Sequence, residues 1–389
     1  MSVTFARGFR AGAAAAGLKS TGALDVCVVA NDGSDVAAAA VFTSNRVSAA
    51  PVRWSQRVLA EGDVRAVVLN SGGANACTGP EGAHDTAVMA QDTAQALHVP
   101  VDSVAVCSTG LIGVRLPMDR VSSGIATAVA ALSDSAQAGI EAARAIMTTD
   151  SVPKTAVLQQ VNGSGSDWRI GGMAKGAGML APGLATMLVV ITTDARVDCA
   201  IAQAALEAAC GQTFNRLDSD GCMSTNDTVL LMSSGLAGPV DADEFAHGLH
   251  QICRDLVRQL QHDAEGSTKD ITIRVSGAAC ETDAETAARA IARSALLKCA
   301  IHGEDPNWGR VLAALGTCDI DFDPDNVDVC LNGTKVCEAS QAGAPRERVT
   351  WQGRDVTIEV DLHAGDCDAV VWTNDLTAMY VHENSAYSS

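Results

Sequence analysis

A threonine at the entrance to an apolar run is the first candidate for chemistry in this chain. Residues 175–185 read KGAGMLAPGLA, and residues 186–191 continue as TMLVVI, an apolar, β-branched run of strand length. A threonine hydroxyl is a poor nucleophile without a neighbouring base. A cut between Ala185 and Thr186 would supply that base as a free α-amine, whose pKa is ~7.7–8. The alternative is a Gly-Pro-rich turn that leads an ordinary threonine into a buried strand.

A second group of residues could stabilise an oxyanion. A strand predicted over 103–107 ends in Ser108, Thr109 and Gly110, ahead of a predicted helix. Small residues at such a turn leave backbone N–H groups free, and the Thr109 hydroxyl adds a donor, which suits an oxyanion hole. A turn with a threonine cap is the alternative. The Asn- and Gly-rich loop 70–79 likewise fits either a ligand loop or a plain turn.

Three aspartates could bind a metal ion, but their spacing does not match that of an EF-hand loop. Asp218, Asp220 and Asp227 lie in the polar stretch 214–228, but no Glu stands at the twelfth position of an EF-hand loop. Cys107 ends a strand where a nucleophile could lie, yet a buried cysteine acting as a small hydrophobe is the favoured interpretation. We therefore expect no metal and no cysteine chemistry.

Several common catalytic motifs do not occur in the sequence. The third glycine of a G-x-G-x-x-G fingerprint would fall at Ala181, and a strand rather than a helix follows. The chain contains neither a G-x-x-x-x-G-K-[ST] nor a G-x-S-x-G sequence. The sequence therefore gives poor support for three kinds of site: a dinucleotide site built on that fingerprint, a P-loop and a nucleophile elbow.

The length, charge and cysteine content of the chain limit the number of domains and the kinds of partner that we expect. The chain has 389 residues, 47% of them hydrophobic and only 3% aromatic, which predicts two or three domains with cores of small aliphatic side chains. A net charge of −19 disfavours nucleic acid and anionic membranes as partners. The 13 cysteines form no C-x-x-C pair, which favours reduced thiols. We read no signal peptide and no membrane span, and expect a cytoplasmic protein.

The hydrophobic pattern predicts alternating strands and helices along the whole chain. We expect strands at 24–30, 36–43, 64–69, 103–107, 155–161, 167–174, 186–193, 228–233, 271–276, 326–332, 355–361 and 368–373. We expect helices at 82–97, 117–132, 136–147, 198–212, 243–264 and 281–297, and a frayed C-terminal tail.

Taken together, these stretches resemble the ornithine acetyltransferase family, also called the arginine biosynthesis bifunctional protein family. The segments that carry the resemblance are 70–79, 107–113, 146–150, 173–193, 224–228, 263–269, 305–310 and 383–389. They occur in the family's order over nearly the whole chain. Gly183 and Glu304 depart from the residues expected at those positions, and Gly183 adjoins the expected cleavage site.

The resemblance implies an α/β fold, a stacked αββα sandwich with helices outside the sheets, as in ornithine acetyltransferase and DmpA-like enzymes. It also implies a precursor that cleaves itself between Ala185 and Thr186. The products would be an α chain, residues 1–185, and a β chain, residues 186–389, which stay together as an α2β2 heterotetramer.

The resemblance also implies residue roles that make physical sense. It assigns the nucleophile to Thr186, the oxyanion hole to Thr109 and Gly110, and substrate contacts to Thr148, Lys175, Glu265, Asn384 and Ser389. Lys175 offers a cation for an amino-acid carboxylate, and Glu265 offers an anion for the amine of ornithine.

The implied activity is a ping-pong transfer of acetyl from N-acetylornithine to glutamate, with no cofactor and with acetyl-CoA as a candidate co-substrate. Two alternatives stay open. One is an N-terminal-threonine amidase or aminopeptidase on the same scaffold, and the other is a non-catalytic amino-acid-binding protein.

Overall fold

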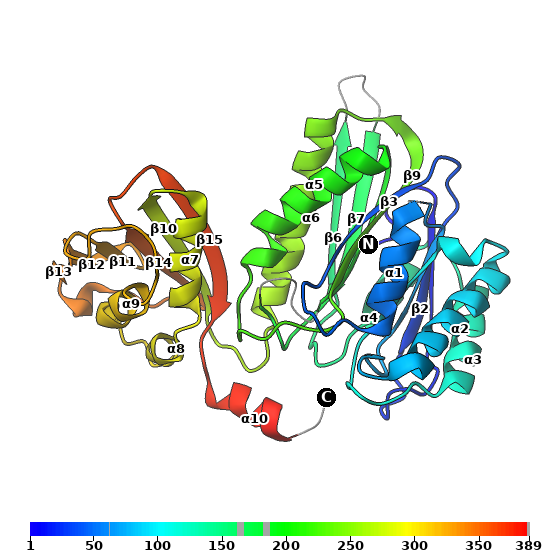
Figure 1. Ribbon diagram of the computed structural model, residues 1–389, viewed down its shortest axis with the longest axis horizontal. Helices are drawn as coiled ribbons and strands as arrows, with labels where there is room; N and C mark the ends of the chain where they lie inside the picture. The colour runs from blue at the N-terminus through cyan, green and yellow to red at the C-terminus, as the bar shows by residue number, and fades with distance from the viewer. Residues whose placement is uncertain (62, 162–166, 182–186, 387–389) are drawn as a thin grey trace.

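A computed structural model describes residues 1–61, 63–161, 167–181 and 187–386. Figure 1 shows two parts, a layered N-terminal part on the right and a smaller C-terminal lobe on the left. None of the described helices is long and apolar enough to cross a membrane.

The N-terminal part contains two stacked sheets. The first has the strand order β1-β2-β4-β5, with bounds Phe9–Ala14, Val26–Asn31, Ala66–Asn70 and Val104–Ser108. The second has the order β3-β9-β8-β7-β6, with bounds Ala37–Phe42, Thr228–Pro239, Leu188–Arg196, Asp167–Lys175 and Lys154–Val161. The β4–β5 and β8–β9 pairs are parallel, and the other pairs are antiparallel.

Helices cover the outer faces of both sheets. Helices α2 (Gly79–Leu97) and α3 (Met118–Ala130) pack on the first sheet, and α5 (Cys199–Gln212) and α6 (Ala242–His262) pack on the second. Helices α1 (Ala50–Glu61) and α4 (Ala136–Ala145) contribute to the core between the sheets. The order of layers is helix, sheet, sheet, helix, so the expected αββα sandwich is confirmed.

Strand β8 lies at the centre of this arrangement. Its alternate side chains Val189 and Ile191 face the α5–α6 layer, while Leu188 and Val190 face the opposing sheet. Because both faces are buried, the strand is a continuous apolar run instead of an alternating one. Small side chains line the core between the sheets, with Phe9 among the few aromatic ones.

The C-terminal lobe has its own sheet, which the sequence analysis did not separate from the sandwich. Its strand order is β13-β12-β11-β14-β10-β15, with bounds Gln341–Ala342, Thr334–Glu338, Asp328–Leu331, Asp355–Asp361, Asp270–Ala278 and Cys367–Asn374. Helices α7 (Glu281–Ala292), α8 (Ala295–His302) and α9 (Trp308–Leu315) belong to the lobe, and all three supply side chains to its core. Short 3₁₀ turns occur at Val101–Ser103, Phe214–Arg216 and Arg346–Arg348.

Two sequence predictions were wrong at this level. The single helix expected over 281–297 is two helices, because Ser294 accepts a hydrogen bond from the Leu297 N–H at 3.3 Å and starts α8. The tail expected to fray, residues 383–389, is helical in its described part, because helix α10 (Ala378–Ala386) includes residues 383–386. Its start is held by Thr377, whose hydroxyl donates to the Gly266 carbonyl at 2.6 Å and accepts from the Tyr380 N–H at 3.0 Å.

Candidate active site

Lys175 is the buried centre of the candidate site. It is the last residue of β7 and is 1% exposed. Its ammonium donates to the hydroxyl of Thr148 at 2.7 Å and to that of Thr109 at 3.4 Å. Two residues predicted for different roles, oxyanion stabilisation and substrate contact, therefore meet at one cation.

Asp150 is the counter-charge that the sequence analysis missed. Its carboxylate accepts from Lys154 Nζ at 2.6 Å and from the Gly176 N–H at 2.6 Å, and it lies 3.9 Å from Lys175 Nζ. Burial alone would raise the pKa of Asp150, but the charges of Lys175 and Lys154 and the hydrogen bonds lower it to about 2. The carboxylate is therefore ionised at neutral pH.

The surroundings of the Lys175 ammonium lower its pKa overall. Burial lowers the pKa of Lys175, and the nearby Lys154 charge acts in the same direction. The carboxylates of Asp150, Asp227 and Glu265 oppose that shift and favour the charged form.

The turn at Thr109 and Gly110 retains donors for an oxyanion. The Thr109 N–H is occupied, because it donates to the Asn70 carbonyl at 3.0 Å. Within the described chain, no residue accepts a hydrogen bond from the Gly110 N–H. Gly110 has φ +131°, and a Cβ there would lie 2.7 Å from the Gly73 nitrogen, so the turn requires glycine. The available donors are thus the Thr109 hydroxyl and the Gly110 N–H.

Asn226 holds this turn from behind and was not singled out as a site residue. Its side-chain amide is 4% exposed and donates to the carbonyls of Ala74 at 2.6 Å and Ser108 at 2.8 Å. It therefore ties the loop after β4 to the end of β5. A buried amide with two backbone partners fixes the position of the chain beside it.

Glu265 joins the site through the segment that follows Lys175. Its N–H donates to the Ala177 carbonyl at 3.0 Å. A Cβ at Gly178 would lie 2.6 Å from Glu265 Oε2, so the carboxylate packs directly on that glycine. Asn384 of α10 donates to Oε2 at 2.9 Å. Glu265 and Asn384, predicted to contact substrate, therefore touch each other.

Asp227 contacts the residue that follows the candidate nucleophile in sequence. Its Oδ1 accepts from the Met187 N–H at 3.0 Å, whereas Oδ2 is buried without a hydrogen-bond partner among the described residues. Burial raises the pKa of Asp227 well above that of an ordinary carboxyl.

The described residues contain no cluster of three or more potential metal ligands. Asp218 instead pairs with Arg293 at 2.7 Å.

Part of the predicted site falls outside the described chain. Thr186, Ala185, Gly183 and Ser389 lie outside the described residues. Cys107 is fully buried, and burial raises the pKa of its thiol to about 12, which favours the interpretation of a small core side chain.

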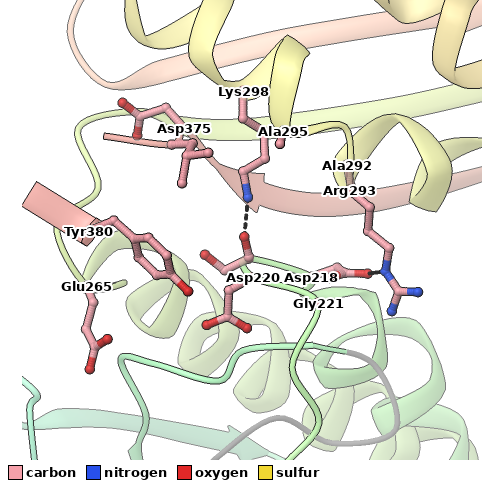
Figure 2. A pocket seen from close by; sticks show the side chains of 12 residues that line it. Asp218, Asp220, Gly221, Glu265, Ala292, Arg293, Ala295, Lys298, Asp375 and Tyr380 are labelled. Atoms are coloured by element: carbon pink, nitrogen blue, oxygen red, sulfur yellow. Dashed lines mark hydrogen bonds and ion pairs between the residues drawn. The ribbon is translucent and has the colours of Figure 1, made fainter. Parts of the chain in front are cut away.

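A pocket of about 250 Å³ opens next to Glu265, between the sandwich and the C-terminal lobe (Figure 2). Its lining includes Glu265, Asp220, Lys298, Arg293, Asp375 and Tyr380. The site therefore combines a buried ammonium, hydroxyl and N–H donors at a strand-to-helix turn, and a pocket that carries both signs of charge.

An αββα sandwich that holds a buried ammonium, free hydroxyl and N–H donors and a charged pocket is the arrangement of a candidate enzyme active site. The profile of the ArgJ family matches residues 10–389, and the chain belongs to that family. The arginine biosynthesis bifunctional protein ArgJ of Streptomyces coelicolor is 57% identical over 390 residues, covering 100% of both chains. That of Bifidobacterium longum is 52% identical over 395 residues, again covering 100% of both.

Among solved structures, ornithine acetyltransferase from Mycobacterium tuberculosis, in complex with ornithine, is 53% identical in sequence. The match covers 48% of this chain and 96% of that one, with a TM-score of 0.45.

Proposed function

We propose that this chain is a glutamate N-acetyltransferase of arginine biosynthesis, which moves acetyl from N-acetylornithine to glutamate by a ping-pong mechanism. Full-length relatives at 52–57% identity bear the name arginine biosynthesis bifunctional protein, which supports this proposal. The observation that carries it is the buried Lys175 ammonium, shared between Thr109 and Thr148.

The proposed nucleophile is Thr186, freed as the first residue of a β chain when the precursor cuts itself after Ala185. Its α-amine takes the hydroxyl proton while the oxygen attacks the acetyl carbonyl, and the negative charge develops on the carbonyl oxygen. The Thr109 hydroxyl and the Gly110 N–H are the proposed donors to that oxygen, worth ~3–4 kcal/mol each.

Collapse of the tetrahedral intermediate breaks the bond to ornithine, whose leaving amine takes the proton back from the ammonium of Thr186. The α-amine of glutamate then attacks acetyl-Thr186, and the same steps in reverse give N-acetylglutamate and the free hydroxyl. Lys175 and Thr148 are proposed to hold the substrate carboxylate, and Glu265, Asn384 and Ser389 the rest of the amino acid. No cofactor enters these steps.

Two further points belong to the proposal. The α and β chains are expected to remain associated as an α2β2 assembly. Acetyl-CoA is a second candidate donor, which would give the same acetyl-Thr186 intermediate and allow glutamate to be acetylated without N-acetylornithine.

The test compares the two half-reactions. Without glutamate, the processed enzyme should release one ornithine per active site in a burst and gain the mass of one acetyl group on the β chain. Adding glutamate should give steady turnover to N-acetylglutamate. Steady acetate release without glutamate would favour the amidase instead, and a single uncut chain without any burst would favour a binding protein. Acetyl-CoA is tested as donor in the same assay.

A further inference from the structure

The two substrates of the proposed reaction have side chains of opposite charge, and the pocket beside Glu265 must bind both. The donor carries a cationic amine at the end of its side chain, and the acceptor carries a carboxylate at the corresponding end. Both amino acids must bring their α-nitrogen to the same acetylated hydroxyl. A single side-chain subsite that accepts both therefore needs an anion for one and a cation for the other. This inference rests on the proposed function.

The pocket offers anions for the donor. Glu265 and Asp220 both line it, and the Asp220 carboxylate accepts from the Cys222 N–H at 3.1 Å (Figure 2). Burial raises the pKa of Asp220.

Lys298 is the cation that the pocket leaves available. It belongs to α8, is 8% exposed, and reaches into the pocket, where its ammonium donates to the Ser219 carbonyl (Figure 2). Among the described residues it forms no ion pair, although an ammonium has three donors. Burial lowers the pKa of Lys298, and the charges of Asp220, Asp218 and Asp375 oppose that shift and favour the protonated form.

The other charges of the lining are already paired. The Arg293 guanidinium donates to Asp218 at 2.7 Å. Asp375 accepts from the N–H groups of Thr268 and Lys269 at 2.8 Å and contacts His302 at 2.8 Å. Lys298 is thus the one cation on the described lining whose ammonium has no carboxylate partner within ion-pair distance. The carboxylate of a bound ligand would supply the partner that the Lys298 ammonium lacks.

We propose that Lys298 receives the side-chain carboxylate of the acceptor, so that the pocket beside Glu265 is a two-sign subsite. The donor's ammonium binds Glu265, and the acceptor's carboxylate binds Lys298. Lys298 thereby selects an acidic acceptor without contributing to the first half-reaction.

The test is the Lys298→Met variant of the processed enzyme, with each half-reaction measured separately. The burst of ornithine from N-acetylornithine should keep its amplitude and rate. The KM for glutamate should rise about 10- to 100-fold, the effect of losing one hydrogen bond to a charged group. The preference for glutamate over the neutral analogue glutamine should fall by the same factor. Lys298→Arg should keep most of that preference.

Lys269→Met is the matched control. Lys269 is also 8% exposed, and its ammonium donates to Glu304 at 2.6 Å, away from the pocket lining. We expect this variant to leave the glutamate-to-glutamine ratio unchanged.

Three results would overturn the assignment. One is an unchanged glutamate-to-glutamine ratio in Lys298→Met. Another is an equal loss in both half-reactions, which a structural role would give. If Lys298→Met does not fold, Lys298→Arg keeps the charge on a longer side chain and should improve aspartate relative to glutamate, and an unchanged ratio there would count against the proposal. Failure of the wild-type enzyme to transfer acetyl would instead refute the proposed function.

Discussion

The carboxylate of Glu265 lies against the backbone of Gly178, so closely that a Cβ on Gly178 would be 2.6 Å from Oε2. This contact explains the second glycine of the KGAGM segment. Any larger residue there would force the Glu265 carboxylate to shift from this position. The contact also couples the segment that leads toward the expected cleavage site to the residue proposed to recognise ornithine.

Gly178→Ala should therefore move the Glu265 carboxylate and lower kcat/KM for N-acetylornithine by about 10- to 100-fold, as a misplacement of about 1 Å does. Gly211→Ala in α5 is the matched control, because nothing lies within 4 Å of its added Cβ. It should leave kcat/KM unchanged. Steady-state kinetics on both variants, with melting temperatures, checks the prediction, and equal kcat/KM in both would contradict it.

Glu265→Gln should impair use of N-acetylornithine more than it impairs self-cleavage. The amide keeps an oxygen for the Asn384 hydrogen bond, which is 2.9 Å long, but loses the negative charge. The loss of a charge-assisted hydrogen bond predicts a fall of about 10- to 100-fold in kcat/KM. Kinetics and a denaturing gel of the same preparation give the comparison, and parallel loss of cleavage and transfer would point to a role in folding.

Thr186→Ala should leave an uncut chain without transfer activity, because a single hydroxyl serves both reactions. Thr186→Ser should retain both at a reduced rate, since a hydroxyl and an α-amine remain. A denaturing gel and the half-reaction assay read out the two functions. Two fragments from the alanine variant would show that cleavage uses another nucleophile.

Asp150→Asn should destabilise the protein in a pH-dependent way. The pKa of Asp150 is lowered from 3.8 to about 2, which corresponds to about 2 kcal/mol of folding free energy. This stabilisation is complete well above the unfolded-state pKa of 3.8. It is lost as the pH falls toward 2, because Asp150 is protonated in the unfolded state at a higher pH than in the folded state. Urea denaturation should show a constant deficit between pH 7 and about 5 that shrinks near pH 3. A deficit that does not change with pH would assign the effect to packing.

Local signals were sufficient to predict most elements from the sequence. Asp198 was expected to start a helix, and its carboxylate accepts from the Ile201 N–H at 2.8 Å at the start of α5. The apolar run from Thr186 predicted a buried strand, and strand β8 is described from Leu188 onward with both faces buried. Strand β1 was missed because its sequence, FRAGAA, is rich in glycine and alanine and lacks β-branched residues.

The site could not be predicted from local pattern, because its contacts join distant positions. Lys175 and Thr148 are 27 positions apart, and Asn384 and Glu265 are 119 apart. The resemblance named these four residues, and the structure brings them together in two contacting pairs. Asp150, Asn226 and Lys298 had no assigned role, because an aspartate, asparagine or lysine gains a role only through the partners that folding supplies.

The last prediction concerns pH and the charge of Lys175. If the α-amine of Thr186 is the base, kcat/KM should rise with pH through the apparent pKa of that amine, whose unperturbed value is ~7.7–8. A nearby ammonium disfavours a second positive charge and lowers that pKa. Lys175→Met should therefore move the rising limb to higher pH as well as weaken substrate binding.

The variant is expected to fold, because Asp150 keeps its hydrogen bonds to Lys154 and the Gly176 N–H, both at 2.6 Å. The measurement is kcat/KM against pH for the processed enzyme and for Lys175→Met. A limb that does not move would show that the two groups are not coupled. A wild-type profile that is flat from about pH 6 to 9, a window that brackets the unperturbed amine, would remove the amine from the role of base.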